Sequence, residues 1–275
     1  MSSCPSKNPA ATDDDQEKID ARMSHIQHKV FVLSGKGGVG KSTIAVNMAV
    51  SLAESGKKVG LLDIDIHGPS VPTMLGLYQM PLVQNEGSIE PVYAGNLKVM
   101  SIGFILNNED DALIWRGPMK MGVIKQLLGD VEWGELDYLI VDCPPGTGDE
   151  PLSIVQLIKD PDGAVVVTTP QRVAAVDVRK SLTFCRKLDV PVLGILENMS
   201  GFSCPKCGEV SEIFRTGSGQ KMATDFDIPF LGALPIDPAI VAACDGGVPF
   251  IQQYENTETA KLMKTLMAPI LALSE

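Results

Sequence analysis

The sequence predicts an α/β fold built on a doubly wound, mostly parallel sheet with helices on both faces. Short apolar runs alternate with stretches of helical spacing along most of the 275 residues, an order that is typical of parallel strands joined by crossover helices. The runs are apolar at nearly every position rather than at every second one, which indicates strands buried on both faces. A chain of this length can form one such domain with a full core.

Each expected element rests on one of these two patterns. The apolar runs predict strands at 29–33, 58–62, 97–101, 138–141, 163–168, 192–196 and 230–233. The helical spacing predicts helices at 41–54, 119–128, 150–157, 173–188, 218–226, 238–244 and 255–271. Gly56 and Gly129 stand where two of these helices need C-terminal caps. No repeat or linker interrupts this alternation, so we expect one domain.

The N-terminal residues differ from the body in composition. Residues 1–15 are polar and carry two prolines and an acidic run, which predicts a disordered segment, followed by a short helix at 16–23. The expected organisation is therefore a flexible N-terminal tail over residues 1–23 and one folded domain over residues 24–275.

Charge and hydropathy argue against several classes of protein. The net charge of −11 argues against a nucleic-acid-binding surface and against adsorption to an anionic membrane. No apolar segment approaches the roughly 20 residues that span a bilayer, and the N-terminus lacks the apolar core of a signal peptide. We therefore expect a cytoplasmic protein without nucleic-acid or membrane partners. In that compartment the six cysteines are not expected to form a disulfide framework.

A phosphate-binding loop is the most informative motif. The sequence GKGGVGKST lies between the first expected strand and the helix 41–54, which is the context that a P-loop needs. Its glycines allow backbone N–H groups to face phosphate oxygens, and the helix dipole adds positive potential. Lys41 is expected to reach the β- and γ-phosphates, and the Ser42 hydroxyl to bind Mg²⁺. The chain is thus expected to be a P-loop NTPase. The expected nucleotide-binding residues of the loop are Gly35, Lys36, Gly37, Gly38, Val39, Gly40, Lys41, Ser42 and Thr43.

Lys36 narrows the class of P-loop protein. It follows the first glycine of the loop, where it cannot easily fold back onto phosphates that Lys41 already contacts. A nucleotide on a second subunit is in better reach, so Lys36 is expected to act in trans; a solvated surface lysine is the alternative. The arrangement resembles the deviant Walker A motif of the MinD, ParA and nitrogenase iron protein group, where this lysine acts across a nucleotide sandwich dimer.

Carboxylates at two further strand ends complete the expected catalytic site. In LLDIDIHGPS, Asp65 is expected to orient the attacking water and Asp63 to lie in the Mg²⁺ shell. In YLIVDCPPGTGDE, Asp142 has the Walker B pattern of a carboxylate near the metal. The loop 144–149 is expected to shift when the γ-phosphate leaves. The sequence therefore assigns catalytic roles to Lys36, Lys41 and Asp65, and Mg²⁺ contacts to Ser42, Asp63 and Asp142.

Three residues are candidates for contacts with the base of the nucleotide. Asn198 follows the strand 192–196 and is expected to hydrogen-bond adenine, with Pro235 and Asp237 forming the other wall. An asparagine after a strand is also a common turn residue, which is the alternative. No N-K-x-D guanine motif occurs, and the choice of ATP over GTP follows mainly from the family resemblance below.

One close cysteine pair indicates metal or redox chemistry. Cys204 and Cys207 form CPKCG, a spacing that places two thiolates on one side of a turn, as in zinc and iron–sulfur knuckles. Both metals normally need four ligands, and the chain has no second C-x-x-C motif. Two copies related by a two-fold axis would supply four thiolates, in the same homodimer that Lys36 requires. A zinc-clamped dimer, a redox dithiol and a bare structural turn are the alternatives.

Cys143 is interpreted as a small buried residue, with a soft ligand near the switch loop as the alternative.

Five motifs in order, GKGGVGKST, DIDIHGPS, DCPPGTGDE, ENMSGF and CPKCG, resemble those of the Mrp/ApbC/Nbp-type iron–sulfur cluster carrier ATPases. The resemblance extends from about residue 24 to the C-terminus. It implies a homodimeric ATPase that uses ATP and Mg²⁺, binds a [4Fe–4S] cluster through Cys204 and Cys207 of both copies, and hands it to apo-proteins. Partners among apo iron–sulfur recipients and the cluster assembly machinery are implied as well. The chain departs from the eukaryotic cytosolic branch, whose N-terminal four-cysteine site is reduced here to Cys4.

Three other functions share parts of this pattern. A positioning ATPase like MinD or ParA needs a membrane-binding tail or a basic DNA surface. A nucleotide-gated electron donor like the nitrogenase iron protein uses single cysteines that are dispersed along its chain. A zinc-stapled regulatory NTPase would use the cysteines only as a structural clamp. The compact C-x-x-C motif and the acidic charge favour the carrier.

Overall fold

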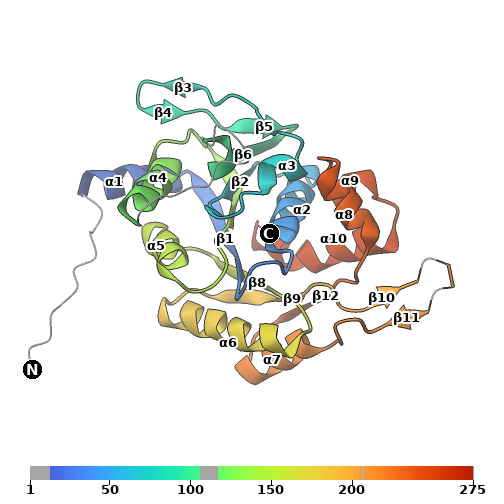
Figure 1. Ribbon diagram of the computed structural model, residues 1–275. Coiled ribbons are helices and arrows are strands. Elements are labelled where there is room, and N and C mark those ends of the chain that lie inside the picture. The colour runs from blue at the N-terminus through green and yellow to red at the C-terminus, as the bar shows by residue number, and fades with distance from the viewer. Residues whose placement is uncertain (1–12, 106–116, 205, 208, 275) are drawn as a thin grey trace, which may run out of the picture.

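A parallel sheet forms the centre of the computed structural model, which describes residues 13–105, 117–204, 206–207 and 209–274 (Figure 1). Its strands are β1 (Ile26–Ser34), β2 (Val59–Asp63), β5 (Val92–Ala94), β6 (Leu97–Ser101), β7 (Leu136–Asp142), β8 (Gly163–Thr168), β9 (Val192–Glu197) and β12 (Phe230–Ala233). They lie in the order β12-β9-β8-β1-β7-β2-β6-β5, and all neighbours are parallel except β5 and β6. The predicted fold class is confirmed, and every strand that the sequence predicts is present.

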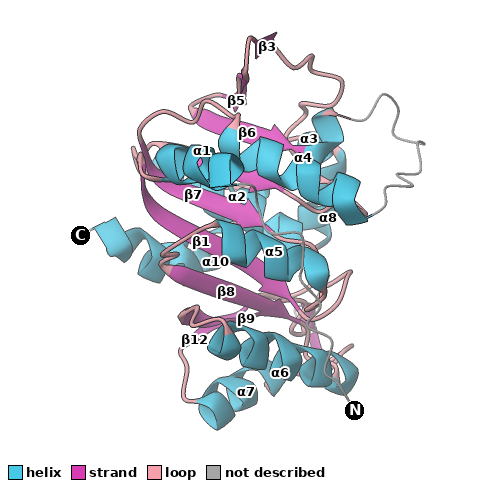
Figure 2. Cartoon of the chain, turned by 90° about the vertical axis from the view of Figure 1, so that its left-hand side faces the viewer, coloured by secondary structure: helices cyan, strands magenta, loops and turns pink. Residues whose placement is uncertain are grey.

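Helices cover both faces of this sheet (Figure 2). The longer helices are α1 (Asp13–Met23), α2 (Lys41–Glu54), α4 (Gly117–Gly129), α5 (Asp149–Leu157), α6 (Arg172–Lys187), α7 (Ser218–Phe226), α8 (Pro238–Asp245) and α10 (Glu258–Leu271). On one face α2 and α10 pack with Val30 and Val32 of β1. On the other, α1, α4 and α5 pack with Phe31 and Leu33. Alternate residues of one apolar strand thus enter opposite cores, as a sheet buried on both faces requires.

The N-terminal helix differs from the expected domain boundary. α1 begins at Asp13, earlier than the short helix predicted at 16–23, and it packs on α4. Ile19 is fully buried and Met23 is 4% exposed, so the apolar side of α1 closes part of the core. Residues 13–23 therefore belong to the folded unit rather than to a flexible tail. Residues 1–12, the rest of the predicted tail, lie outside the described residues.

Short elements were missed because each has too few residues to show a period. They are the helices α3 (Val71–Met74) and α9 (Phe250–Gln253), the 3-10 turns η1 (Ile102–Phe104) and η2 (Ala272–Ser274), the strand β5, and two hairpins, β3 (Gln84–Asn85) with β4 (Ser88–Ile89) and β10 (Phe202–Ser203) with β11 (Val210–Ser211). The β10–β11 hairpin projects from the body next to β12 (Figure 1). In the described part of the chain, no helix is both long and apolar enough to cross a membrane.

Candidate functional site: a nucleotide cavity and a cysteine arm

The candidate nucleotide site lies at the carboxyl ends of the neighbouring strands β1, β7 and β2. Asp63 of β2 is the register partner of Asp142 of β7, which in turn pairs with Val32 of β1. The P-loop leaves β1 and runs into α2, which begins at Lys41. A cavity of about 360 Å³ lies between the P-loop and the loops after β2 and β7. Its lining consists of Ser34, Lys36, Gly37, Gly38, Gly40, Lys41, Ser42, Thr43, Asp65, His67, Gly68, Ser70, Met74 and Pro145.

Close packing explains two glycines of the P-loop. A Cβ atom on Gly35 would lie 2.4 Å from the backbone of Asp177 in α6, and one on Gly40 would lie 2.2 Å from Nδ2 of Asn198. Gly40 also has a φ of +84°, a left-handed conformation that residues with a side chain disfavour. These glycines therefore let α6 and the end of β9 pack directly on the phosphate loop.

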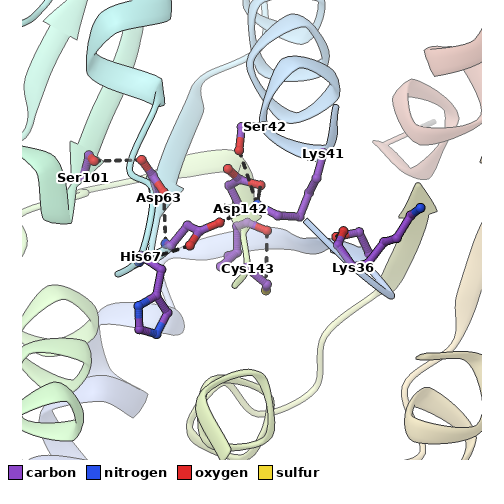
Figure 3. A network of polar contacts seen from close by, with 11 residues as sticks. Lys36, Lys41, Ser42, Asp63, His67, Ser101, Asp142 and Cys143 are labelled. Carbon is purple, nitrogen blue, oxygen red and sulfur yellow. Dashed lines mark hydrogen bonds and ion pairs between the residues drawn. The ribbon is translucent and has the colours of Figure 1, made fainter. Parts of the chain in front are cut away.

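Lys41 is buried among carboxylates (Figure 3). Its Nζ atom lies 2.5 Å from Oδ1 of Asp142 and 3.5 Å from Oδ2 of Asp65, and it donates to the Ser42 hydroxyl at 3.3 Å. Burial alone would lower the pKa of Lys41, but the carboxylates, Asp142 first, raise it above its usual value. The side chain is therefore a permanent cation on the wall of the cavity, where phosphate oxygens can replace the carboxylates as its partners.

Asp63 and Asp142 form a buried acidic pair behind Lys41, and both are fully buried. Burial, followed by the charge of Asp142, raises the pKa of Asp63 to about 7, and burial also raises the pKa of Asp142 despite the nearby ammonium. Ser101 Oγ donates to Asp63 at 2.8 Å. Among the described residues, Oδ2 of Asp142 has no hydrogen-bond partner. A buried carboxylate oxygen without a partner, close to the Ser42 hydroxyl, fits a hard cation such as Mg²⁺.

Replacing Asp63 by asparagine is expected to remove a pH dependence from the stability of the metal-free protein. Folding raises the pKa of Asp63 from 3.8 to about 7, so the folded state holds a proton in this range that the unfolded state releases. Wild-type stability should therefore fall as the pH rises through that range. Each pKa unit corresponds to about 1.4 kcal/mol, so the variant should gain several kcal/mol over wild type at high pH. Urea unfolding in EDTA at acidic and alkaline pH measures this difference, and a difference that does not change with pH would contradict it.

Lys36 points away from the cluster around Lys41 (Figure 3). Its Nζ atom donates to Oε1 of Gln171, just before α6, at 3.1 Å, while the residue also lines the cavity. This hydrogen bond to a neutral amide holds the ammonium without neutralising its charge. The structure thus separates the two lysines of the P-loop, and action of Lys36 in trans stays a prediction.

Further polar contacts join the loops around the cavity, and no sequence motif indicated them. The Gly146 N–H donates to the carbonyl of Ser34 at 2.8 Å, which ties the loop after β7 to the end of β1. Lys120 Nζ of α4 lies 2.6 Å from Oε1 of Glu150 and 3.1 Å from Nε2 of His67. Since His67 follows β2 and Glu150 lies in the first turn of α5, Lys120 links the loop after β2 to the start of α5. Only long-range packing brings these residues together.

The three residues expected to contact the base of the nucleotide lie outside the cavity lining. Asn198 is buried against the P-loop, where its Nδ2 atom donates to the carbonyl of Val39 at 2.9 Å. Pro235 and Asp237 are half-buried after β12, and Oδ1 of Asp237 caps α8 by accepting from the Ala239 N–H at 2.9 Å. None of the three predicted base-binding residues is part of the cavity lining given above. Their contact with adenine stays a prediction.

Residues 200–217, here called the cysteine arm, carry the predicted metal ligands in the turn between β10 and β11. Cys204 is half-buried and Cys207 exposed. Backbone N–H groups of Lys206 and Cys207, followed by the Cys207 thiol, lower the pKa of Cys204. The thiolate, which is the metal-binding form, is thereby favoured. Within the described residues, no group of three or more His, Cys, Asp or Glu side chains could hold a metal ion.

Cys143 and Cys185 belong to the core instead. Both are fully buried, and burial raises the pKa of Cys185 to about 11 and that of Cys143 further. The Cys143 thiol donates to the carbonyl of Val141 at 3.7 Å. These properties support the interpretation of Cys143 as a small buried residue rather than a soft ligand, because a ligand needs the thiolate.

Comparisons with known proteins agree with this geometry. The family model for the ParA-type NUBPL iron-transfer P-loop NTPase matches residues 25–271. The chain belongs to this family. The chain is similar to a solved nucleotide-binding protein from Archaeoglobus fulgidus, in complex with ADP and with cobalt. The two share 40% sequence identity and a TM-score of 0.75, over 89% of this chain and 98% of that one.

More distant structures share the fold of this chain. The Pyrococcus furiosus cell division ATPase MinD has 23% identity and a TM-score of 0.66, over 90% of this chain and 99% of that one. A putative plasmid partition protein from Borrelia burgdorferi, bound to AMPPNP, has 18% identity and a TM-score of 0.61 over the same shares. The resemblance found in the sequence motifs is confirmed, and the chain is a P-loop ATPase.

Proposed function

We propose that this P-loop ATPase is an ATP-dependent carrier that binds a [4Fe–4S] cluster across a homodimer and transfers it to apo-proteins. The observation that carries the proposal is the cysteine arm. Its two cysteines are accessible, and the pKa of Cys204 is lowered, in a chain of an iron-transfer family. Accessible thiolates suit a ligand set that must be both filled and emptied. The cytoplasm is the proposed compartment, because it keeps such thiols reduced.

A second copy would complete the ligand set. A [4Fe–4S] cluster takes four thiolates, whereas one arm supplies Cys204 and Cys207. Two arms related by a two-fold axis supply four, and the same symmetry brings Lys36 toward the nucleotide of the other copy. The proposed partners are therefore a second copy of the chain, apo iron–sulfur recipients and the cluster assembly machinery.

ATP would occupy the cavity with its phosphates on the P-loop N–H groups and on Lys41. Ser42 and Asp142 would hold Mg²⁺, with Asp63 behind them, and the ion would offset the phosphate charge. Asp65 lines the cavity beside Lys41 and would orient the attacking water. Lys36 of the other copy would add positive charge at the γ-phosphate. Asn198, Pro235 and Asp237 are the residues that we propose for the base.

ATP hydrolysis would alter cluster binding through a movement of the loop after β7. The Gly146 N–H is held by the Ser34 carbonyl, so this loop is tied to the strand that precedes the P-loop. Loss of the γ-phosphate would shift residues 144–149 and relax the dimer. The two cysteine pairs would then separate and hold the cluster less tightly. The energetic requirement is a difference in cluster affinity between the ATP and ADP states.

A positioning function like that of MinD finds less support, although the fold is shared. Among the described helices, α10 has an apolar side, but its residues Met263, Leu266 and Ile270 are buried in the core and do not form a membrane-binding surface. The net charge of −11 disfavours binding to DNA. A zinc-clamped NTPase is the second candidate, because zinc accepts the same thiolates.

Delivery of a cluster to an apo-enzyme tests the carrier function. Protein loaded anaerobically with iron and sulfide would be mixed with an apo-enzyme that needs a [4Fe–4S] cluster, in the presence of an iron chelator. We expect activation to be faster with ATP than with ADP, lost with Cys204→Ser and retained with Cys4→Ser. Activation that the chelator abolishes, or that Cys204→Ser supports equally well, would indicate free iron and contradict the carrier.

A further inference from the structure

Glu197 is a fully buried carboxylate at the end of β9 that the nucleotide chemistry above does not use. Its Oε1 atom accepts from Ser200 Oγ at 2.6 Å and from the Gly217 N–H at 2.9 Å. Its Oε2 atom accepts from the Gly219 N–H at 2.6 Å and from Ser218 Oγ at 3.3 Å. Both oxygens are thus hydrogen-bonded, which a buried polar group requires.

The donors to Glu197 lie at the two ends of the cysteine arm. Ser200 begins the arm, Gly217 ends it, and Gly219 lies in the first turn of α7, which follows. Gly219 permits this approach, because a Cβ atom there would lie 3.0 Å from Cβ of Glu197. Beyond this base the arm is a two-stranded hairpin that projects from the body (Figure 1), and such hairpins have little stability of their own. The position of the cysteines therefore depends on how the two ends of the arm are held.

The residue after Glu197 contacts the phosphate loop. Asn198 donates from Nδ2 to the Val39 carbonyl at 2.9 Å and from its backbone N–H to Thr168 O at 2.7 Å. The close approach of Gly40 to Nδ2 leaves no room between the loop and this side chain. A shift of the P-loop around bound phosphates would therefore displace Asn198 as well.

Backbone contacts to the segment that follows β12 hold the beginning of the arm. The Ser200 N–H donates to Leu234 O and the Ile236 N–H donates to Gly201 O, both at 2.8 Å. These contacts involve only the beginning of the arm. Glu197, in contrast, holds the beginning and the end of the arm together. A movement of residue 198 would therefore displace both ends of the arm in the same direction.

We propose that Glu197 is a positioning residue that transmits nucleotide occupancy of the P-loop to the cysteine arm. Asn198 follows the Val39 carbonyl, and the adjacent Glu197 carries the movement to both ends of the arm, which reorients Cys204 and Cys207 together. What the cysteines bind rests on the proposed function. The link itself requires only that the P-loop binds a nucleotide.

Alkylation of the arm in metal-free protein tests this link. Reduced protein would react with iodoacetamide, with or without Mg²⁺ and a non-hydrolysable ATP analogue, and mass spectrometry would follow the peptide containing Cys204 and Cys207. In wild type we expect the nucleotide to change the rate by about fivefold or more, the lower range of measured couplings between sites. In Glu197→Gln the ratio of the two rates should fall to near one, with nucleotide affinity within about threefold of wild type.

Two further variants keep this test decisive. Thr216→Ala removes another hydroxyl from the arm, one that donates to Glu212 at 3.2 Å, and it should keep the wild-type ratio. If Glu197→Gln does not fold, Ser200→Ala removes only one donor to Glu197 and should lower the ratio part of the way.

An alkylation rate in wild type that does not change with the nucleotide would overturn the inference. An unchanged ratio in folded Glu197→Gln would also overturn it, as would an unchanged ratio in Ser200→Ala where Glu197→Gln does not fold. The assay contains no iron, so its outcome is independent of whether the arm carries a cluster. Loss of the carrier function would appear in the transfer assay instead, and it would leave the link intact.

Discussion

Lys41→Gln is expected to reduce ATP hydrolysis by about 10²–10³-fold, the scale seen when one charge-stabilising group is lost from an active site. Lys41 is the buried cation of the cavity, and three carboxylates, Asp142, Asp65 and Asp63, surround it. Without its charge these carboxylates face the phosphates unopposed, so both nucleotide affinity and turnover should fall. Phosphate release measures turnover, and binding of a fluorescent nucleotide measures affinity.

Loss of the Lys41 charge also affects folding. Removal of one partner of a buried ion pair costs about 3–5 kcal/mol, so urea unfolding must show that the variant is folded in the assay. Lys264→Gln is a matched control, because its pair with Glu54 at 2.9 Å is partly exposed and contributes about 1 kcal/mol or less. The control should hydrolyse ATP normally. A folded Lys41→Gln protein that keeps wild-type turnover would contradict the assigned role.

Mixing Lys36→Ala with Lys41→Gln is expected to restore hydrolysis that neither variant shows alone. If Lys36 acts in trans, a mixed dimer has one complete site, because the Lys36→Ala copy keeps its own Lys41 and receives Lys36 from the other copy. With random exchange of subunits, about a quarter of the sites become active. Phosphate release from mixtures of varied ratio measures this recovery.

The alternative role of Lys36 gives a different result. A lysine that acts in its own subunit leaves both sites of every mixed dimer incomplete, so the mixture would stay inactive. Exchange of subunits can be verified by co-purification of a tagged copy with an untagged one. An inactive mixture despite exchange would contradict the trans role and the dimer geometry proposed with it.

Local sequence patterns were sufficient to predict most of the fold. The P-loop glycines, Lys41 and the apolar runs on either side predicted β1 and α2 because every part of that signal lies within one short stretch of sequence. The carboxylates Asp63 and Asp142 were placed correctly at strand ends, and the parallel register then made them neighbours. The start of α10 was placed too early, although Thr257, which caps the helix by accepting from the Ala260 N–H at 3.2 Å, was a local signal for it.

Long-range contacts could not be predicted from one sequence. Gln171 holds Lys36, Lys120 joins two loops, and Glu197 closes the cysteine arm, yet none of these residues lies in a motif that indicates its partner. The packing of α1 was missed for the same reason: residues 13–23 are polar in composition, and only the core at α4 explains why Ile19 is buried.

Iron, sulfide and zinc analysis of anaerobically purified protein, beside Cys204→Ala, tests the shared cluster most directly. A [4Fe–4S] cluster held by both copies predicts about four iron and four sulfide per dimer, lost in Cys204→Ala, with little zinc. One zinc per dimer without sulfide would contradict the carrier and make Cys204 and Cys207 a structural clamp between two copies of an ATPase.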